Sequence, residues 1–188
     1  FAADVPDFAR RLIDAFWPGP LTLILPRRAG VGAAAAGGQD SIGLRCPSHP
    51  VAQALLRACA AQGVHGLAAP SANPFGRVSP TTAAHVQAGL GEALLVLDGG
   101  ACDVGIESTI VDCTRSAPVL LRPGGVSRAQ VEAASGQRLR ARDELATPAP
   151  RASGTLLAHY APSAPVRLMD AKALQTALDL LGADAARL

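Results

Sequence analysis

The sequence has few aromatic residues, few cysteines and little net charge, and each scarcity argues against a class of protein. Its four cysteines include no C-x-x-C pair, so a structural zinc site or a redox dithiol has little support. Aromatic residues make up 3% of the chain, and 17 basic residues stand against 15 acidic ones, which gives a net charge of +2. Nucleic-acid binders usually carry a basic surface and stacking aromatics, so composition does not favour that class.

Long apolar runs are missing as well. No segment resembles a signal peptide or is long enough to cross a bilayer, and we therefore expect a cytoplasmic protein without membrane contact. Of the 188 residues 49% are hydrophobic, which is enough for a sizeable core in one or two domains. The chain begins at Phe1 without a methionine and stops just after a helical pattern, so we interpret it as an internal fragment.

Apolar spacing and turn residues predict an α/β protein. Helices are expected at residues 4–16 with Asp4 as N-cap, 51–61 with Pro50 in the first turn, 80–88 with Ser79 as N-cap, 128–135 with Ser127 as N-cap, and 171–181. Strands are expected from Leu67, and at 21–25, 41–45, 93–97, 106–112, 119–121 and 166–169. The alternation within 106–112 predicts a half-exposed strand. Residues 136–157 lose periodicity, which predicts an exposed linker.

The loop from Leu67 to Thr82 has the composition of an anion-binding segment. It offers the side-chain donors Ser71, Asn73 and Ser79. A helix that begins at Ser79-Pro80 would add free backbone N–H groups, where the helix dipole favours a phosphate or a carboxylate. The same turn-forming residues are more often a plain connection, so the residues alone do not decide for an anion site.

Two arginines are placed at the ends of predicted strands. Ser41, Gly43 and Arg45 share one face of their strand, and the guanidinium of Arg45 could bind a carboxylate or phosphate in a bidentate fork. A solvated edge-strand arginine is the alternative. Arg122 ends the strand 119–121 just before Pro123-Gly124-Gly125, where the glycines leave it room to reach a phosphate.

Several spaced motifs then occur in one order along the chain. They are Ser71-Ala72-Asn73, Gly76-Arg77, Ser79-Pro80-Thr81, Gly105-Ile106-Glu107-Ser108-Thr109-Ile110 and Leu121-Arg122-Pro123-Gly124-Gly125. This set resembles the YrdC-type threonylcarbamoyl-AMP synthase family, and His159-Tyr160-Ala161-Pro162 resembles the linker of its two-domain members. The resemblance implies a YrdC-like twisted mixed sheet with flanking helices in residues 1–135, a linker in 136–165, and the start of a Rossmann-like second domain in 166–188.

The resemblance also implies substrates and site residues. ATP would be bound by Ser41, Ser71, Ser79, Arg122 and Tyr160, and L-threonine by Arg45, Ala69 and Ser108. With Mg²⁺ and bicarbonate, the family forms threonylcarbamoyl-AMP and pyrophosphate, and the product goes to the transferase machinery that modifies tRNA. Such chemistry needs positioning and charge neutralisation more than a nucleophilic side chain. The Trp17-Pro18-Gly19-Pro20-Leu21-Thr22 signature offers no acid, base or charge, and we interpret it as structural.

The N-terminal Pro-Thr-Glu-Thr-Val-Tyr-Gly-Leu-like segment of the family does not occur here, so we expect little synthase activity from this chain alone. Two other functions make different demands on the sequence. A double-stranded RNA or tRNA binding module is the alternative, against which the charge and the few aromatics argue. A Rossmann-type dehydrogenase would need a G-x-G-x-x-G between a strand and a helix, and the sequence has none.

Overall fold

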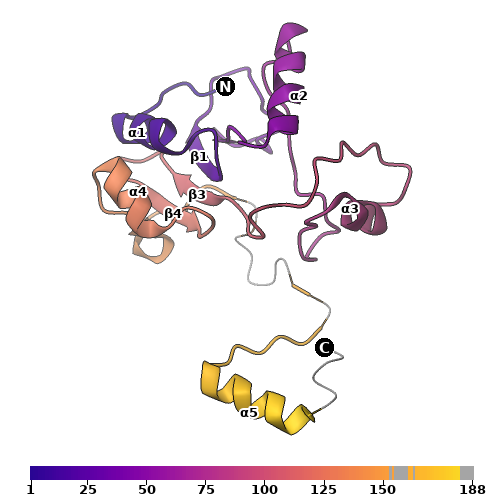
Figure 1. Ribbon diagram of the computed structural model, residues 1–188. Coiled ribbons are helices and arrows are strands. Elements are labelled where there is room, and N and C mark those ends of the chain that lie inside the picture. Colours follow the sequence, from indigo (N-terminus) through magenta and orange to yellow (C-terminus); the bar gives the residue numbers. More distant parts are fainter. Residues whose placement is uncertain (153, 155–160, 163, 183–188) are drawn as a thin grey trace.

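A mixed five-stranded sheet forms the centre of the computed structural model, which describes residues 1–152, 154, 161–162 and 164–182 (Figure 1). The strands are β1 (Leu21–Pro26), β2 (Ser41–Leu44), β3 (Thr109–Asp112), β4 (Val119–Arg122) and β5 (Arg140–Ala141), in the order β2-β1-β3-β4-β5. The helices are α1 (Asp7–Phe16), α2 (Pro50–Ala61), α3 (Ala83–Leu90), α4 (Arg128–Ser135) and α5 (Ala171–Leu181), with a 3₁₀ turn η1 (Arg142–Glu144). β1 runs parallel to β3 and antiparallel to β2, so the expected mixed α/β sheet with flanking helices is confirmed.

The larger part of the core lies between one face of the sheet and the helices α1 and α4. In β1 the leucines at alternate positions, Leu21, Leu23 and Leu25, are buried on this face. Helix α1 contributes Phe8, Ala9 and Leu12, whose spacing places them on one side of the helix. Each fully buried leucine stabilises the fold by about 2 kcal/mol. This layer fixes the strands from which the site is built.

The opposite face of the sheet has a smaller core. Ile24, Ile110, Val119 and Leu121 are buried there, and Leu145, Ala149 and Ala152 pack against them. β3 is therefore covered on both faces, and all four of its residues are buried, so the prediction of a half-exposed strand was wrong. Residues 136–152 are mostly exposed, with Leu139 the single buried residue among them, but this stretch also forms β5 and η1 and its residues Leu145, Ala149 and Ala152 pack against this face.

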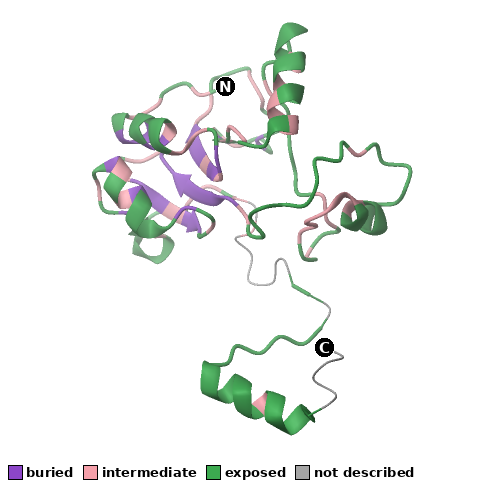
Figure 2. Cartoon of the chain, viewed as in Figure 1, coloured by how far each residue is buried: buried purple, intermediate pink, exposed green. Residues whose placement is uncertain are grey.

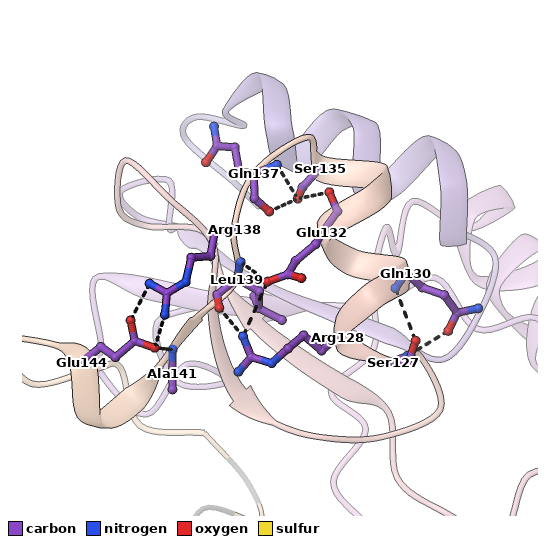
Figure 3. Close-up of polar contacts among 10 residues, drawn as sticks. All are labelled: Ser127, Arg128, Gln130, Glu132, Ser135, Gln137, Arg138, Leu139, Ala141 and Glu144. Atoms are coloured by element: carbon purple, nitrogen blue, oxygen red, sulfur yellow. Dashed lines mark hydrogen bonds and ion pairs between the residues drawn. The ribbon is translucent and has the colours of Figure 1, made fainter.

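Helix α4 and the turn that follows are fixed by polar contacts (Figure 3). Ser127 and Gln130 form a capping box, which confirms Ser127 as the N-cap, and Gly136 ends the helix in the left-handed conformation at φ 67°. Arg138 binds Glu144 at 2.8 Å. The pKa of the Glu144 carboxyl is lowered by the backbone N–H of Ala141 and then by Arg138. These contacts fix the path of the chain between α4 and the residues that pack on the smaller core.

Several element boundaries differ from prediction. Pro6, and not Asp4, precedes α1, and no side chain caps that helix. Helix α3 begins at Ala83, where Thr82 accepts a hydrogen bond from His85 N, so the expected start at Ser79-Pro80 was wrong. The segments 67–70, 93–97 and 166–169 form no strand. A strand needs a neighbour for its N–H and C=O groups, and none lies beside these segments in the described part of the chain.

The region from α2 to residue 106 is much more exposed than the sheet (Figure 2). Neither α2 nor α3 has a buried residue, and Phe75 and Leu95 expose 83% and 87% of their surface. Helix α5 likewise has no buried residue. Among the described helices, none is long and apolar enough to span a bilayer.

Candidate functional site

A β-bulge in β4 turns Arg122 toward the smaller core. Val111 pairs with Leu120 while Ile110 pairs with Arg122, so Leu121 is an extra residue on β4. If Leu121 were paired regularly with Ile110, alternation would place Arg122 on the side of Leu120, which packs under α4. Ile110 also pairs with Thr22 on its other side. Thr22, Ile110 and Arg122 therefore form one row across three strands.

Ser108, two residues before Ile110, receives the guanidinium of Arg122. Arg122 Nε and Nη2 donate to the carbonyl oxygen of Ser108 at 3.1 and 2.8 Å, and Nη2 also donates to Ser108 Oγ at 3.0 Å. Ser108 Oγ lies 2.8 Å from Thr22 Oγ1. Ser108 and Arg122 are both buried. Two hydroxyls and a buried cation thus meet at one end of the sheet.

Glu107 connects this cluster to the distant loop that carries Ser79. Ser79 Oγ donates to Glu107 Oε1, and Glu107 Oε2 lies 3.8 Å from Arg122 Nη2. A buried guanidinium is stable only with acceptors around it, and the carboxylate and the Ser108 oxygens provide them. We name the five residues Thr22, Ser79, Glu107, Ser108 and Arg122 the hydroxyl–arginine cluster.

The turn after β4 holds the backbone of the cluster in place. A Cβ on Gly124 would overlap the backbone at Glu107, Ser108 and Thr109, so only glycine allows this approach. Thr109 Oγ1 donates to Val126 O at 2.7 Å and accepts from Val126 N at 2.9 Å. The glycines after Arg122 therefore serve close packing of the turn against β3.

Arg45 follows β2 near the same end of the sheet. Leu44 pairs with Leu23, and Gly19 N donates to Cys46 O at 2.8 Å, so Arg45 comes near the start of β1, where Thr22 lies. The guanidinium of Arg45 is exposed and has no hydrogen bond or ion pair among the described residues. Ser41 pairs with Pro26 at the other end of β2 and does not join the cluster.

The remaining predicted site residues are placed differently. Ser71 and Ala69 are exposed, and no hydrogen bond joins either of them to the cluster among the described residues. Asn73 closes its own loop by donating to Pro74 O and Arg77 O at 3.0 Å each. Because α3 begins later than expected, Ser79 does not present a helix N-terminus. Tyr160 lies outside the described residues.

Sequence reasoning missed the contacts of Thr22 and gave Glu107 no definite partner. Thr22 is the single polar residue in the strand sequence Leu-Thr-Leu-Ile-Leu, and that interruption was the available signal. Within the described residues no group of three or more His, Cys, Asp and Glu side chains could hold a metal ion. The cluster is suited to bind anionic oxygens through arginine and hydroxyl donors.

The family profile Sua5/YciO/YrdC, described as "Telomere recombination", matches residues 1–124. A second profile, the C-terminal domain of threonylcarbamoyl-AMP synthase, matches residues 126–187. The chain belongs to the Sua5/YciO/YrdC family. The expected resemblance to the YrdC-type synthases is thus confirmed.

Named members of the Sua5/YciO/YrdC family are similar over most of this chain. Threonylcarbamoyl-AMP synthase from Pyrococcus abyssi is 38% identical over 173 residues, which is 90% of this chain and 49% of that protein. The Bacillus subtilis enzyme of the same name is 39% identical over 88% of this chain and 47% of its own length. The chain therefore spans about half the length of these relatives.

A solved structure agrees with the fold. Sua5 from P. abyssi, determined in complex with L-threonine, matches with a TM-score of 0.81 and 36% identity over 96% of this chain and 54% of that one. Escherichia coli YciO matches with a TM-score of 0.53 and 27% identity over 64% of this chain and 58% of that one.

Proposed function

We propose that this chain contributes the hydroxyl–arginine cluster to the site of a threonylcarbamoyl-AMP synthase. The observation that carries the proposal is the meeting of Ser79, Ser108 and Arg122 in one hydrogen-bonded cluster. These three residues come from separate motifs, and they are three of the eight residues that the family resemblance assigns to ATP or L-threonine. The names of the relatives support the same reaction.

In this proposal ATP, bicarbonate and L-threonine are the substrates. Arg122 and Ser79 face the nucleotide, while Ser108 and the exposed Arg45 face the amino acid. The carboxylated amino group and the phosphates are both anionic, which suits guanidinium and hydroxyl donors. Since the described residues contain no group of three or more acidic, His or Cys side chains that could hold a metal, Mg²⁺ would enter on the ATP phosphates.

The product, threonylcarbamoyl-AMP, would supply a tRNA threonylcarbamoyl transferase in the cytoplasm, and pyrophosphate would leave. In this proposal the chain acts as part of a nucleotidyltransferase, and the reaction itself involves no contact with tRNA or double-stranded RNA.

Isothermal titration calorimetry with MgATP and L-threonine tests the proposal on this chain. We expect MgATP to bind, L-threonine to bind more tightly in its presence, and Arg45→Ala to weaken L-threonine binding about tenfold while MgATP binding persists. Arg45 is the sharpest position for a variant because its side chain is exposed and unpaired among the described residues.

Arg10→Ala is the matched control, because Arg10 is an exposed arginine of α1, on the other face of the sheet. Arg122→Ala is expected to abolish MgATP binding, and circular dichroism would verify that this variant is folded. If the parent chain binds neither ligand at millimolar concentration, or if Arg45→Ala and Arg10→Ala behave alike, the proposal is wrong.

A further inference from the structure

Ser108 has a limited number of hydrogen-bonding positions, and two of them are engaged. A hydroxyl group donates once and accepts twice. Arg122 Nη2 can only donate, so its contact with Ser108 Oγ at 3.0 Å uses one acceptor position. The contact of 2.8 Å with Thr22 Oγ1 uses a second position, as donor or as acceptor. The direction of this second bond decides what Ser108 can offer to a ligand.

The positive charge of Arg122 indicates the direction of the hydrogen bond between Ser108 and Thr22. The guanidinium of Arg122 lies against Ser108 and favours an anionic neighbour, and an anionic oxygen accepts hydrogen bonds. Ser108 can donate to such a group only if its own proton is not already given to Thr22. Thr22 would then be the donor to Ser108 Oγ. Among the described residues Ser108 Oγ is the single partner of Thr22 Oγ1, so no other contact competes for that proton.

We propose that Thr22 is a positioning residue, whose hydroxyl donates to Ser108 Oγ and so turns the Ser108 proton toward a carboxylate or carbamate oxygen of the amino-acid substrate. This inference rests on the proposed function for the identity of the substrate. The hydrogen-bond direction itself rests on the contacts of Thr22, Ser108 and Arg122.

Gly43 of the neighbouring strand lies beside Thr22 on the same face. A Cβ on Gly43 of the neighbouring strand would lie 3.6 Å from the Thr22 methyl carbon and 3.2 Å from Ile24 Cδ1. Because glycine has no side chain, no Cβ contacts Thr22 or Ile24 from this position. Glu107, the negative group near Ser108, is engaged with Ser79 and Arg122.

Two substitutions separate the hydroxyl from the shape of the side chain. Thr22→Val keeps the β-branched form that suits a strand and removes the hydroxyl, whereas Thr22→Ser keeps the hydroxyl and removes the methyl group. By calorimetry we expect Thr22→Val to weaken L-threonine binding about tenfold with MgATP affinity within about twofold of the parent. Thr22→Ser is expected to bind both ligands within about threefold of the parent.

A double-mutant cycle in urea measures the same hydrogen bond without any ligand. Trp17 is the sole tryptophan, and its indole N–H donates to Leu21 O at 2.7 Å, so its fluorescence reports unfolding beside Thr22. Thr22→Val and Ser108→Ala are each expected to raise the unfolding equilibrium constant about fivefold, and the double variant by clearly less than the product.

The two experiments distinguish the possible failures. If the two substitutions have independent effects in the cycle, Thr22 does not act through Ser108, and the inference is wrong whatever the ligands do. Unchanged L-threonine binding in Thr22→Val, or equal losses in Thr22→Val and Thr22→Ser, would also overturn it. Coupling in the cycle with no L-threonine binding by the parent would overturn the proposed function and the substrate assigned to Ser108.

Discussion

At the scale of single residues, Glu107 joins two parts of the chain that are 28 positions apart. Its carboxylate accepts the hydroxyl of Ser79 and lies beside the guanidinium of Arg122. We expect Glu107→Ala to lower the free energy of unfolding by about 1–2 kcal/mol, because both contacts are lost. Glu107→Gln keeps an acceptor for Ser79, so its loss should be smaller.

Urea unfolding followed by Trp17 fluorescence measures both Glu107 variants, with Glu92→Ala, an exposed glutamate, as the control. Equal stability of Glu107→Ala and the parent would show that the contact with Ser79 does not hold the loop.

The buried thiol of Cys113 makes the free energy of unfolding depend on pH. Burial raises its pKa well above the ordinary value, and the nearby charge of Asp112 raises it further. In the unfolded chain the thiol ionises near pH 8.5, while in the folded chain it stays protonated, so the unfolded state binds fewer protons above that pH. Stability is therefore fully present below about pH 8.5 and falls by up to about 1.4 kcal/mol per pH unit above it.

Urea titrations at several pH values from 8 to 11 would measure this slope for the parent and for Cys113→Ala. The parent should lose stability more steeply than the variant. If the free energy of unfolding fell equally with pH in the parent and in Cys113→Ala, the expectation would be wrong.

At the scale of elements, the turn after β4 depends on one glycine. Gly124→Ala would place a methyl group against the backbone at Glu107 and Thr109, so the turn must move away from β3. We expect a loss of about 1–3 kcal/mol in the free energy of unfolding and weaker MgATP binding. Gly105→Ala is the matched control, since nothing lies within 4 Å of the Cβ it would add. Thermal unfolding would compare the two variants, and equal midpoints would count against the packing argument.

Helices and strands could be predicted from the sequence where their apolar residues pack against another element. Helix α1 and strand β1 pack on each other, and their apolar spacing located both to within a few residues. The run 93–97 has the same character but no neighbouring strand in the described residues. Within the site, the sequence placed Arg122 at a strand end. It could not predict the bulge at Leu121 or the contact of Thr22 with Ser108, because both depend on pairing between distant strands.

At the scale of the whole molecule, the buried residues are distributed unevenly along the chain. The sheet with α1 and α4 holds both buried cores, whereas the region from α2 to residue 106 has no buried residue among those described. Local opening costs least where few apolar contacts must be broken. Brief trypsin digestion should therefore cut sooner after Arg77, an exposed residue of the loop before α3, than within α1.

Mass spectrometry of the first fragments would identify that cut. Arg11 is the internal comparison, because its guanidinium donates to Ser135 O and its helix packs on the core. Cleavage after Arg11 at the same rate would show that burial does not govern local stability here.

The extra residue in β4 lets two successive side chains, Leu121 and Arg122, lie on the face of the smaller core. If Leu121 paired with Ile110 in regular alternation, Arg122 would turn toward α4, away from Ser108. Exchanging Leu121 for another apolar residue would leave the count unchanged and the arginine in place. Other apolar residues can therefore replace Leu121, but the irregular pairing at this position must be kept for the arginine to stay beside Ser108.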